Sequence, residues 1–374
     1  MLGLYLHIPF CSAICNYCNF NRGLYEESLK QRYVAALCEE IRRAGLEGQS
    51  GADTIYFGGG TPSLLEPQDV SLLIGSCRTA FAMPPDVEIT LEANPETVTR
   101  ETLSAFRTAG VNRLSFGVQS FRDEELKRLS RLHDAARARE AYAWARQAGF
   151  DNVSFDLMMW LPGQTREQWL ESVDALIELS PDHASLYLLE LYPNAPLRDE
   201  MARAGQTRSP DDEAADMYLA AMERLDEGGY GQYEISNVAR PGRRARHNLK
   251  YWTDGEWMGF GCGAHSTRRG VRWKNVSVTA EYVQRVADGL EVVSERRVLA
   301  PSTQVEEALF MGLRLVDGVD LEDVNTRYGV DVWGRYGPSL EPYLEQGILR
   351  KEGSRLRLTR QGLLLSHEVM TVFV

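Results

Sequence analysis

The feature that most constrains the fold is an alternation of strand-like and helix-like segments over the first half of the 374-residue chain. One helical pattern carries Leu29, Tyr33, Leu37 and Ile41 at spacings of four and stops at Gly45. The strand-like segments are residues 3–7, 54–57, 87–92, 113–118, 153–158 and 184–189. Such alternation predicts a parallel sheet with right-handed crossovers. Six units are too few for an eight-stranded barrel, so a partial barrel or an open doubly wound sheet is expected.

Unusual residues gather at the carboxyl ends of these predicted strands. They are Tyr5, His7 and three cysteines after the first strand, residues 58–61 after the second, and Glu92, Gln119 and Asp156 at the next three. In parallel α/β folds the loops at this edge converge and form the ligand site. Five separate segments are therefore expected to direct polar groups to one location.

Beyond about residue 200 the alternation fades. An acidic amphipathic helix is expected over residues 211–227, followed by a stretch rich in glycine, arginine and aromatic residues at 230–273. A break at 298–302 precedes a tail whose helices and short strands, at 348–350 and 356–358, look like a small winged-helix module. The expected divisions are a core at 1–228, a connecting region at 229–298 and a C-terminal domain at 299–374.

Charge and hydropathy exclude some classes of function. The net charge of −12 argues against a nucleic-acid binder, because phosphate contacts need basic surface. Arg240, Arg243, Arg244 and Arg246 form a local exception, which we interpret as a solvated basic loop. The apolar stretches are too short to span a membrane, and the amino terminus shows no secretory signal, so a cytoplasmic location is expected.

Three of the six cysteines, Cys11, Cys15 and Cys18, fall within eight residues. In a reducing compartment this spacing indicates metal binding rather than disulfide bonding. Thiolates favour iron–sulfur clusters or zinc. An iron–sulfur cube held at three irons leaves one iron open for a small molecule. A structural zinc site, and with it a simple binding module, needs a fourth ligand such as His7 or Cys262.

Two further motifs each allow a functional and a structural interpretation. Residues 58–62, Gly-Gly-Gly-Thr-Pro, let backbone N–H groups approach a ligand, or merely form a tight turn. Glu92 and Asp156 can accept hydrogen bonds from an amino group or from ribose hydroxyls, or can serve as caps and loop anchors. His247, flanked by Tyr251, Trp252 and the arginines, suits an iron porphyrin, but the residues alone favour a packed aromatic loop with a hydrogen-bonded histidine.

Taken together, the motifs resemble those of the radical S-adenosylmethionine superfamily over essentially the whole chain. The signature runs Tyr5-Leu-His7-Ile-Pro-Phe-Cys11-x3-Cys15-x-Tyr-Cys18, and is followed in order by Gly-Gly-Gly-Thr-Pro at 58–62, Leu-Glu-Ala-Asn-Pro at 91–95, Ser-Phe-Gly-Val-Gln at 115–119 and Asp-Leu at 156–157. The resemblance narrows to the branch of the oxygen-independent coproporphyrinogen oxidase HemN and the haem chaperone HemW. It implies an α/β fold, a partial (β/α)6 barrel with a small C-terminal winged-helix-like domain.

The resemblance also implies site residues and cofactors. Cys11, Cys15 and Cys18 would hold a 4Fe–4S cluster. The positions that match the family's S-adenosylmethionine contacts are Tyr5, Gly59, Gly60, Thr61, Glu92, Gln119, Arg131 and Asp156. Haem is the third implied ligand, and with the family added His247 is predicted to contact it.

Two features favour the HemW side of the branch. The oxidase has a further cysteine two residues after the third cluster ligand, where this chain has Phe20. The segments Tyr-Glu-Ile-Ser-Asn at 233–237 and His-Asn-x-x-Tyr-Trp at 247–252 resemble the haem-handling region of HemW. A haem chaperone is therefore expected, with haem acceptors such as respiratory enzymes as partners, peripheral membrane contact and a homodimer. The alternative is a radical enzyme, oxidase-like or methyltransferase-like.

The chain departs from the family at one position near the site. Where relatives usually read Asp-Leu-Ile-Tyr-Gly-Leu-Pro-Gly, residues 156–163 read Asp-Leu-Met-Met-Trp-Leu-Pro-Gly. Trp160 thus replaces a glycine and is expected to affect the local shape of the pocket, but not cluster binding.

Overall fold

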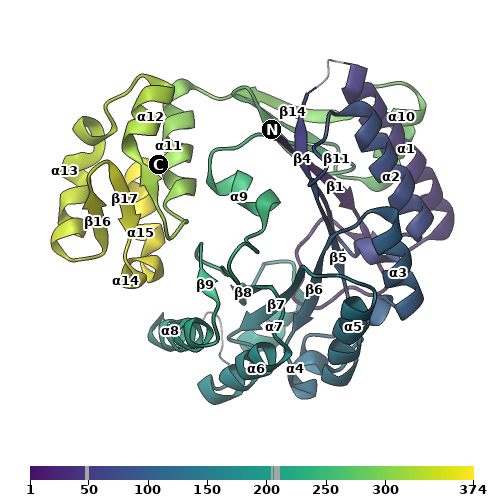
Figure 1. The fold of residues 1–374 in the computed structure, drawn as a ribbon, viewed down its shortest axis with the longest axis horizontal. Coiled ribbons are helices and arrows are strands. Elements are labelled where there is room, and N and C mark those ends of the chain that lie inside the picture. The colour runs from purple at the N-terminus through teal and green to yellow at the C-terminus, as the bar shows by residue number, and fades with distance from the viewer. Residues whose placement is uncertain (47–49, 204, 206–210) are drawn as a thin grey trace.

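The computed structural model describes residues 1–46, 50–203, 205 and 211–374. A large curved sheet with helices on its outer side forms the main body, and a small C-terminal domain lies beside it (Figure 1). Each part has its own hydrophobic core. The expected α/β fold class, a barrel-like sheet with a separate small domain, is confirmed.

Six parallel strands form the centre of the sheet, as the sequence predicts. They are β1 (Leu2–Ile8), β4 (Ala52–Gly59), β5 (Glu88–Ala93), β6 (Arg113–Gln119), β7 (Val153–Met159) and β8 (His183–Leu188), and they lie side by side in that order. Between them run α1 (Glu27–Leu46), α2 (Pro67–Ala80), α3 (Arg100–Ala109), α4 (Asp123–Arg128), α5 (Ala135–Gln147) and α6 (Arg166–Leu179).

The two faces of the strands differ in chemistry. Leu4, Ile55 and Ile89 point to the helix side and are fully buried in the main core. Residues of the opposite parity face the interior of the barrel, and there Arg113 and His183 are buried although they are polar. Because successive side chains of a strand point to opposite faces, one sheet carries an apolar outer layer and a polar interior.

The sheet extends at both edges beyond the six strands. β11 (Trp257–Phe260) pairs in parallel with β1, and β12 (His265–Arg268), β13 (Val271–Asn275) and β14 (Val293–Val298) continue antiparallel from it. At the other edge β10 (Asn237–Ala239) and β9 (Gly231–Gln232) follow β8. These strands all come from the expected connecting region 229–298, which therefore contributes to the main sheet. The boundaries of this connecting region stay a prediction.

Four more helices in the described ranges belong to the main body, among them α10 (Thr279–Ala287), which contributes Tyr282, Val283 and Val286 to the main core. α7 (Pro196–Arg203) and α8 (Asp211–Glu227) follow β8, and α9 (Arg246–Trp252) lies on the concave side of the sheet, between the strands and the C-terminal domain (Figure 1). His247 of α9 reaches Thr54 of β4. α9 therefore closes the barrel interior from the side opposite α1 and α2.

The C-terminal domain has the winged-helix-like composition that was expected. It contains α11 (Pro301–Gly312), β15 (Val319–Asp320), α12 (Leu321–Tyr328), α13 (Val332–Glu345), β16 (Leu349–Glu352), β17 (Arg355–Leu358), α14 (Arg360–Leu364) and α15 (Ser366–Met370). β17 lies between β15 and β16 in a three-stranded antiparallel sheet. β16 and β17 correspond to the two short strands predicted in the tail.

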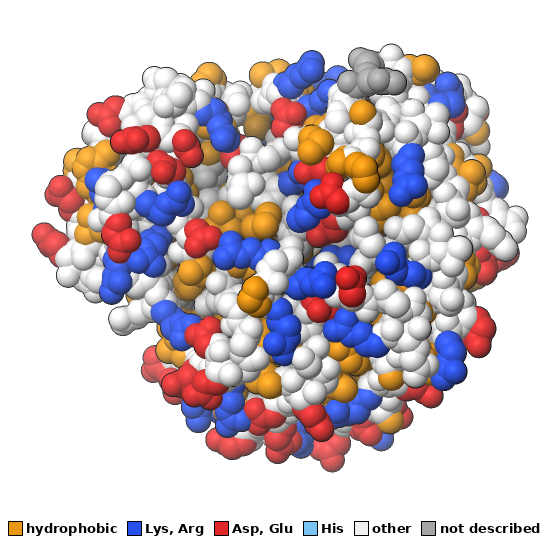
Figure 2. Space-filling model, viewed as in Figure 1, with side chains coloured by type: hydrophobic (Ala, Val, Ile, Leu, Met, Phe, Trp, Pro, Cys, Tyr) orange, Lys and Arg blue, Asp and Glu red, His pale blue; other side chains and the backbone are white. Residues whose placement is uncertain are grey.

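The surface is mixed in charge. On the face seen in Figure 2, basic and acidic side chains are interspersed. No helix within the described ranges has the length and apolar character needed to cross a bilayer.

Candidate functional site

A cavity of about 420 Å³ opens at the carboxyl ends of the parallel strands, where the sequence predicts the site. Its lining comes from the loops after β1, β4, β5, β6, β7 and β8. The predicted site residues that line it are Cys11, Cys15, Cys18, Gly59, Gly60, Thr61, Glu92, Gln119, Arg131 and Asp156. Tyr5 and His247 are not among the lining residues. The structure thus brings the predicted cluster cysteines and seven of the eight predicted S-adenosylmethionine contacts to one place.

The cysteine loop is closed by a short ladder. β2 (Phe10–Cys11) pairs in parallel with β3 (Gly23–Leu24), so residues 12–22 form a loop that carries Cys15 and Cys18. The N–H of Cys18 donates to the carbonyl oxygen of Cys15 at 3.2 Å, and Arg22 donates to the carbonyl oxygen of Cys18. These bonds order a loop that has no helix or long strand of its own.

Two side chains from other elements donate to the cysteine sulfurs. The hydroxyl of Thr61 lies 3.7 Å from Cys11 Sγ, and a guanidinium nitrogen of Arg131 lies 3.5 Å from Cys15 Sγ. Burial raises the pKa of the Cys11 and Cys18 thiols. The nearby Arg22 guanidinium acts in the opposite direction and lowers the pKa of both thiols, and a bound iron would add to this effect.

Neither candidate for a fourth protein ligand lies in the cavity. His7 is bonded through both ring nitrogens, to the Asn21 carbonyl oxygen at 2.8 Å and to the Tyr5 hydroxyl at 3.1 Å. Cys262 is fully buried beside Tyr33 and Thr279. Among the residues that the structure describes, no three potential ligands come close enough to share one metal ion. Three cysteines are the ligand number that a cubane with one open iron takes, whereas a structural zinc takes four protein ligands.

The glycine loop packs directly against the cysteine loop. A Cβ atom on Gly60 would lie 3.0 Å from Cys11 Sγ and 2.7 Å from the Phe10 carbonyl oxygen, and Gly59 has a positive φ of 120°. The N–H groups of Gly60 and Thr61 donate to the carbonyl oxygens of Ile8 and Phe10 at 2.7 and 2.8 Å. Glycine is therefore required here for close approach and for backbone conformation.

Two half-buried carboxyl groups, Glu92 and Asp156, face the cavity from β5 and β7. Glu92 accepts hydrogen bonds from the Tyr56 hydroxyl at 2.7 Å and from the Gly59 N–H at 3.2 Å, and Asp156 accepts one from Ser115 at 3.2 Å. Burial raises the pKa of Glu92 to about 7 and that of Asp156 to about 6. Desolvated carboxylates of this kind are stabilised by a cationic or hydrogen-bonding ligand.

Gln119 and Arg131 hold polar atoms that the protein leaves unpaired. Gln119 Oε1 and Arg131 Nε are buried and have no hydrogen-bond partner among the described residues. Gln119 also adopts a left-handed φ of 67°, which is uncommon outside glycine and typical of functional sites. The Arg131 guanidinium is fixed by Asn94 Oδ1 at 2.6 Å and the Gly117 carbonyl oxygen at 2.7 Å. The site thus presents an unused acceptor and an unused donor for a ligand.

Tyr5 and His247 lie below the cavity, in the barrel interior. The Tyr5 hydroxyl contacts His7 at 3.1 Å, and its ring stacks on Tyr56 with centroids 6.2 Å apart. His247 is only 1% exposed and bonds Thr54 at 2.8 Å and Tyr251 at 2.9 Å through its two ring nitrogens. Burial lowers its pKa to about 3. Haem ligation by His247 stays a prediction, and it requires the ring to give up one of these bonds.

The arginines beside His247 pair with carboxylates of several elements. Arg243 lies 3.5 Å from Asp151, Arg244 lies 2.9 Å from Asp317, and Arg246 lies 3.2 Å from Asp86. Arg240 stacks on the Tyr230 ring, with its guanidinium carbon 4.6 Å from the centroid. This exposed, paired arrangement matches the solvated loop inferred from the sequence.

Sequence reasoning missed several lining residues. They include Tyr17, Asn94, Ser115, Met158, Tyr187 and Tyr192. Asn94 and Tyr17 lie inside the motifs that were recognised, at 91–95 and 11–18, so their place in those motifs was the available signal.

Trp160 has a left-handed φ of 60°, is 6% exposed and is not among the lining residues. The indole therefore packs in the core rather than into the cavity.

Comparison with known proteins gives matches over the whole chain. Residues 5–176 match the Radical SAM superfamily, and residues 299–365 match the HemN C-terminal domain. The protein named haem chaperone HemW is 35% identical over 376 residues in Bacillus subtilis, covering 100% of this chain and 99% of that protein. HemW of Escherichia coli is 34% identical and covers 100% and 98%. The solved structure of HemN from Escherichia coli, a coproporphyrinogen III oxidase, superposes with a TM-score of 0.87 at 25% identity, covering 100% of this chain and 89% of that one.

Proposed function

Because the chain belongs to the HemN/HemW branch of the radical S-adenosylmethionine superfamily and resembles the HemW haem chaperones over its whole length, we propose that it binds haem and delivers it to acceptor proteins. The observation that carries the proposal is this full-length similarity, which reaches across the barrel, the extended sheet and the C-terminal domain. Phe20 supports it, because this side chain lies at the cavity mouth, 70% exposed, where the oxidases have a further cysteine.

The cavity fits the cofactors that the superfamily implies. Cys11, Cys15 and Cys18 would hold a 4Fe–4S cluster at three irons, and Thr61 and Arg131 would donate hydrogen bonds to the ligating sulfurs. A cluster held by these residues would supply one-electron chemistry at low potential beside the S-adenosylmethionine site.

The remaining lining residues would position S-adenosylmethionine. Glu92 would accept hydrogen bonds from the ammonium group and Asp156 from a ribose hydroxyl, since neither carboxylate has a cationic partner in direct contact among the residues that the structure describes. Gln119 Oε1 offers an acceptor that the protein does not use. Gly59 and Gly60 keep side chains out of the space between this ligand and the cysteine loop.

A radical enzyme is the second candidate. It is favoured by the completeness of the cofactor cavity and by the structural similarity to HemN. In that case the same residues would hold S-adenosylmethionine for reductive cleavage. A porphyrinogen or another substrate would then give up a hydrogen atom to the 5′-deoxyadenosyl radical that this cleavage would release. The two candidates differ in one respect: the chaperone leaves its cargo chemically unchanged.

An anaerobic haem titration of cluster-reconstituted protein, followed by Soret absorbance, tests the proposal. The chaperone predicts saturable binding near one haem per chain, with no coproporphyrinogen consumed after S-adenosylmethionine and reductant are added. Binding no tighter than that of serum albumin would reject the chaperone. Substrate-dependent release of 5′-deoxyadenosine would transfer the assignment to the radical enzyme.

The family resemblance also supports partners for this activity. We infer haem acceptors of the respiratory type, reached by peripheral contact with the membrane, and a homodimer whose formation depends on the cluster. Size-exclusion chromatography before and after cluster reconstitution tests the last point. A mass that does not change on reconstitution would reject cluster-dependent dimerisation.

A further inference from the structure

The strand β14 forms an uncovered edge of the main sheet. It is the last strand of the antiparallel extension and lies near the top of the main body in Figure 1. In the described part of the chain its neighbour in the sheet is β13 alone. Residues 294–298 are all exposed, and the Val298 side chain is 80% exposed. An open edge of this kind is a template on which another strand can pair.

The backbone of β14 presents hydrogen-bonding groups at this edge. The Leu299 N–H donates to the Gly270 carbonyl oxygen at 2.8 Å, which shows that odd-numbered residues direct their backbone groups to β13. Arg296 and Val298 have the opposite parity, so their N–H and carbonyl groups point away from β13. These groups have no hydrogen-bond partner among the residues that the structure describes. The edge can therefore take a further antiparallel strand.

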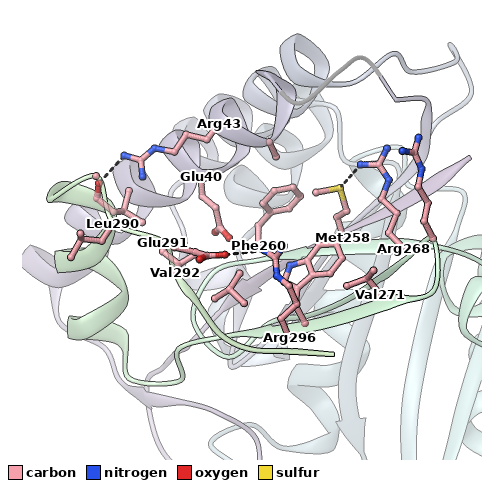
Figure 3. A pocket seen from close by; sticks show the side chains of 16 residues that line it. Glu40, Arg43, Met258, Phe260, Arg268, Val271, Leu290, Glu291, Val292 and Arg296 are labelled. Atoms are coloured by element: carbon pink, nitrogen blue, oxygen red, sulfur yellow. Dashed lines mark hydrogen bonds and ion pairs between the residues drawn. The ribbon is translucent and has the colours of Figure 1, made fainter. Parts of the chain in front are cut away.

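The side chains of β14 carry complementary charges. Glu295 and Arg297 share one face of the strand, and neither forms an ion pair within the described ranges, although Lys274 lies opposite Glu295. Arg296 lies on the other face, beside a cavity of about 700 Å³ between the sheet, α1 and the end of α10, where it pairs with Glu291 at 2.9 Å (Figure 3). Glu295 and Arg297 thus remain available to a partner, whereas Arg296 is already neutralised.

A second copy of this chain offers the matching strand. We propose that β14 pairs antiparallel with β14 of a second copy and joins the two main sheets edge to edge. The inference rests on the homodimer proposed above and names its interface. With Arg296 of both copies at the two-fold axis, Glu295 of each copy lies opposite Arg297 of the other. These are non-hydrogen-bonded positions, where facing side chains approach most closely, so an ion pair forms on each side of the axis.

The charges select this register. Because Arg296 directs its backbone groups outward, it must lie opposite a residue of the same parity. A register centred on Glu295 would place two carboxylates directly opposite each other, and one centred on Arg297 would do the same with two guanidinium groups. A register centred on Arg296 also brings two like side chains together, but each is paired with Glu291 of its own chain. Among the registers centred on charged residues, this one brings opposite charges together.

Charge reversal at the two paired positions tests the interface. A short strand ladder buries less surface than large permanent interfaces do, so the dimer should be weak and dependent on concentration. Sedimentation velocity of the cluster-loaded full chain over a range of concentrations measures its dissociation constant. Glu295→Arg and Arg297→Glu each place like charges opposite each other, and each alone should weaken dimerisation by about tenfold or more.

An equimolar mixture of the two variants provides the matched rescue. In a mixed dimer each arginine again faces a glutamate, so the mixture should dimerise within about twofold of the unmodified chain. Glu341→Arg makes the same charge change on an exposed position of α13 and should leave dimerisation unchanged. The S-adenosylmethionine affinity of each variant shows that its barrel is intact.

Dimerisation of both single variants within about twofold of the unmodified chain would overturn this interface and leave the homodimer to another surface. A mixture no more dimeric than its two components would also overturn it, because the loss would then not come from the paired charges. An unmodified, cluster-loaded chain that stays monomeric at every concentration would overturn both the interface and the homodimer. Haem binding by that monomer would leave the chaperone function standing.

Discussion

The guanidinium of Arg131 lies 3.5 Å from the sulfur of Cys15, and its other nitrogen is fixed by Asn94 and Gly117. The residue enters the cavity from the segment after α4, whereas Cys15 belongs to the loop after β1. A half-buried cation held against one ligand of the expected cluster would stabilise the reduced, more negative state of that cluster. We therefore expect the side chain to tune the cluster electrostatically as well as donating a hydrogen bond to its ligand.

Arg131→Gln should lower the reduction potential of the cluster. One charge nearby contributes roughly 1–3 kcal/mol at an effective dielectric constant near 20, and about 1.4 kcal/mol corresponds to roughly 59 mV for one electron. A decrease of roughly 50–100 mV is therefore expected in a potentiometric titration followed by electron paramagnetic resonance. Arg139→Gln, on the outer helix α5, serves as the control. Equal potentials in both variants would show that Arg131 has no electrostatic role.

S-adenosylmethionine affinity should depend on pH through Glu92 and Asp156. Burial raises their pKa to about 7 and about 6, so both carboxyls gain protons as the pH falls through this range. The protonated groups lose their attraction for an ammonium ligand, and each pH unit below a pKa reduces the ionised fraction about tenfold. Affinity measured by equilibrium dialysis should therefore be at least about tenfold lower at pH 6 than at pH 8.

Glu92→Gln should weaken binding at pH 8 and flatten this profile, leaving only the contribution of Asp156. Glu96→Gln provides the comparison, because Glu96 pairs with His133 at 3.0 Å and does not line the cavity. A steep profile that persists in Glu92→Gln would assign the pH dependence to another group.

His247 should make the fold sensitive to acid. Burial lowers its pKa in the folded state to about 3, whereas in the unfolded chain it titrates near 6.5. Between these values the unfolded state binds more protons, so stability is full above about pH 6.5 and falls as the pH decreases toward 3. The expected slope from this residue is about 1.4 kcal/mol per pH unit.

Urea unfolding at several pH values measures this contribution. His247→Gln should lose roughly 1–3 kcal/mol at pH 7.5, because Thr54 or Tyr251 loses a partner, and should show a shallower decrease toward pH 5. His367→Gln, an exposed substitution on α15, should leave the slope unchanged. Parallel curves for the unmodified protein and His247→Gln would show that the imidazole accepts a proton in the folded state.

Trp160 combines two opposing contributions to stability. Its left-handed backbone costs roughly 1–2 kcal/mol for a residue with a Cβ atom, whereas loss of a buried tryptophan side chain costs roughly 3–5 kcal/mol. Trp160→Gly should therefore lower the free energy of unfolding by a net of roughly 1–4 kcal/mol. S-adenosylmethionine affinity should be retained, since the indole does not line the cavity.

Trp160→Ala separates the two contributions. Alanine removes the indole but keeps the strained backbone, so it should be less stable than the glycine variant by roughly 1 kcal/mol. An alanine variant as stable as the glycine variant would show that the positive φ carries no penalty.

The sequence predicted the six parallel strands because each is a short apolar run buried on the helix side, and the cavity because loops after parallel strands converge. It did not predict β9 to β14, since segments such as Trp257–Phe260 are only four residues long and contain a glycine. Nor could it place His247. Whether a histidine on a seven-residue helix meets solvent, a ligand or the barrel depends on packing with distant strands.

The buried Arg113 shows the same limit. Its position at the start of a strand was predicted, but a fully buried arginine is unusual and depends on the polar interior of the barrel.

The most direct test of the chaperone assignment is haem delivery. Cluster-loaded protein carrying one equivalent of haem would be mixed with membranes from haem-starved cells, whose respiratory cytochromes lack their cofactor. The account predicts that cytochrome spectra appear faster than with the same amount of haem on serum albumin, and that the haem recovered is chemically unchanged. Transfer no faster than from albumin, together with S-adenosylmethionine-dependent conversion of coproporphyrinogen, would contradict it.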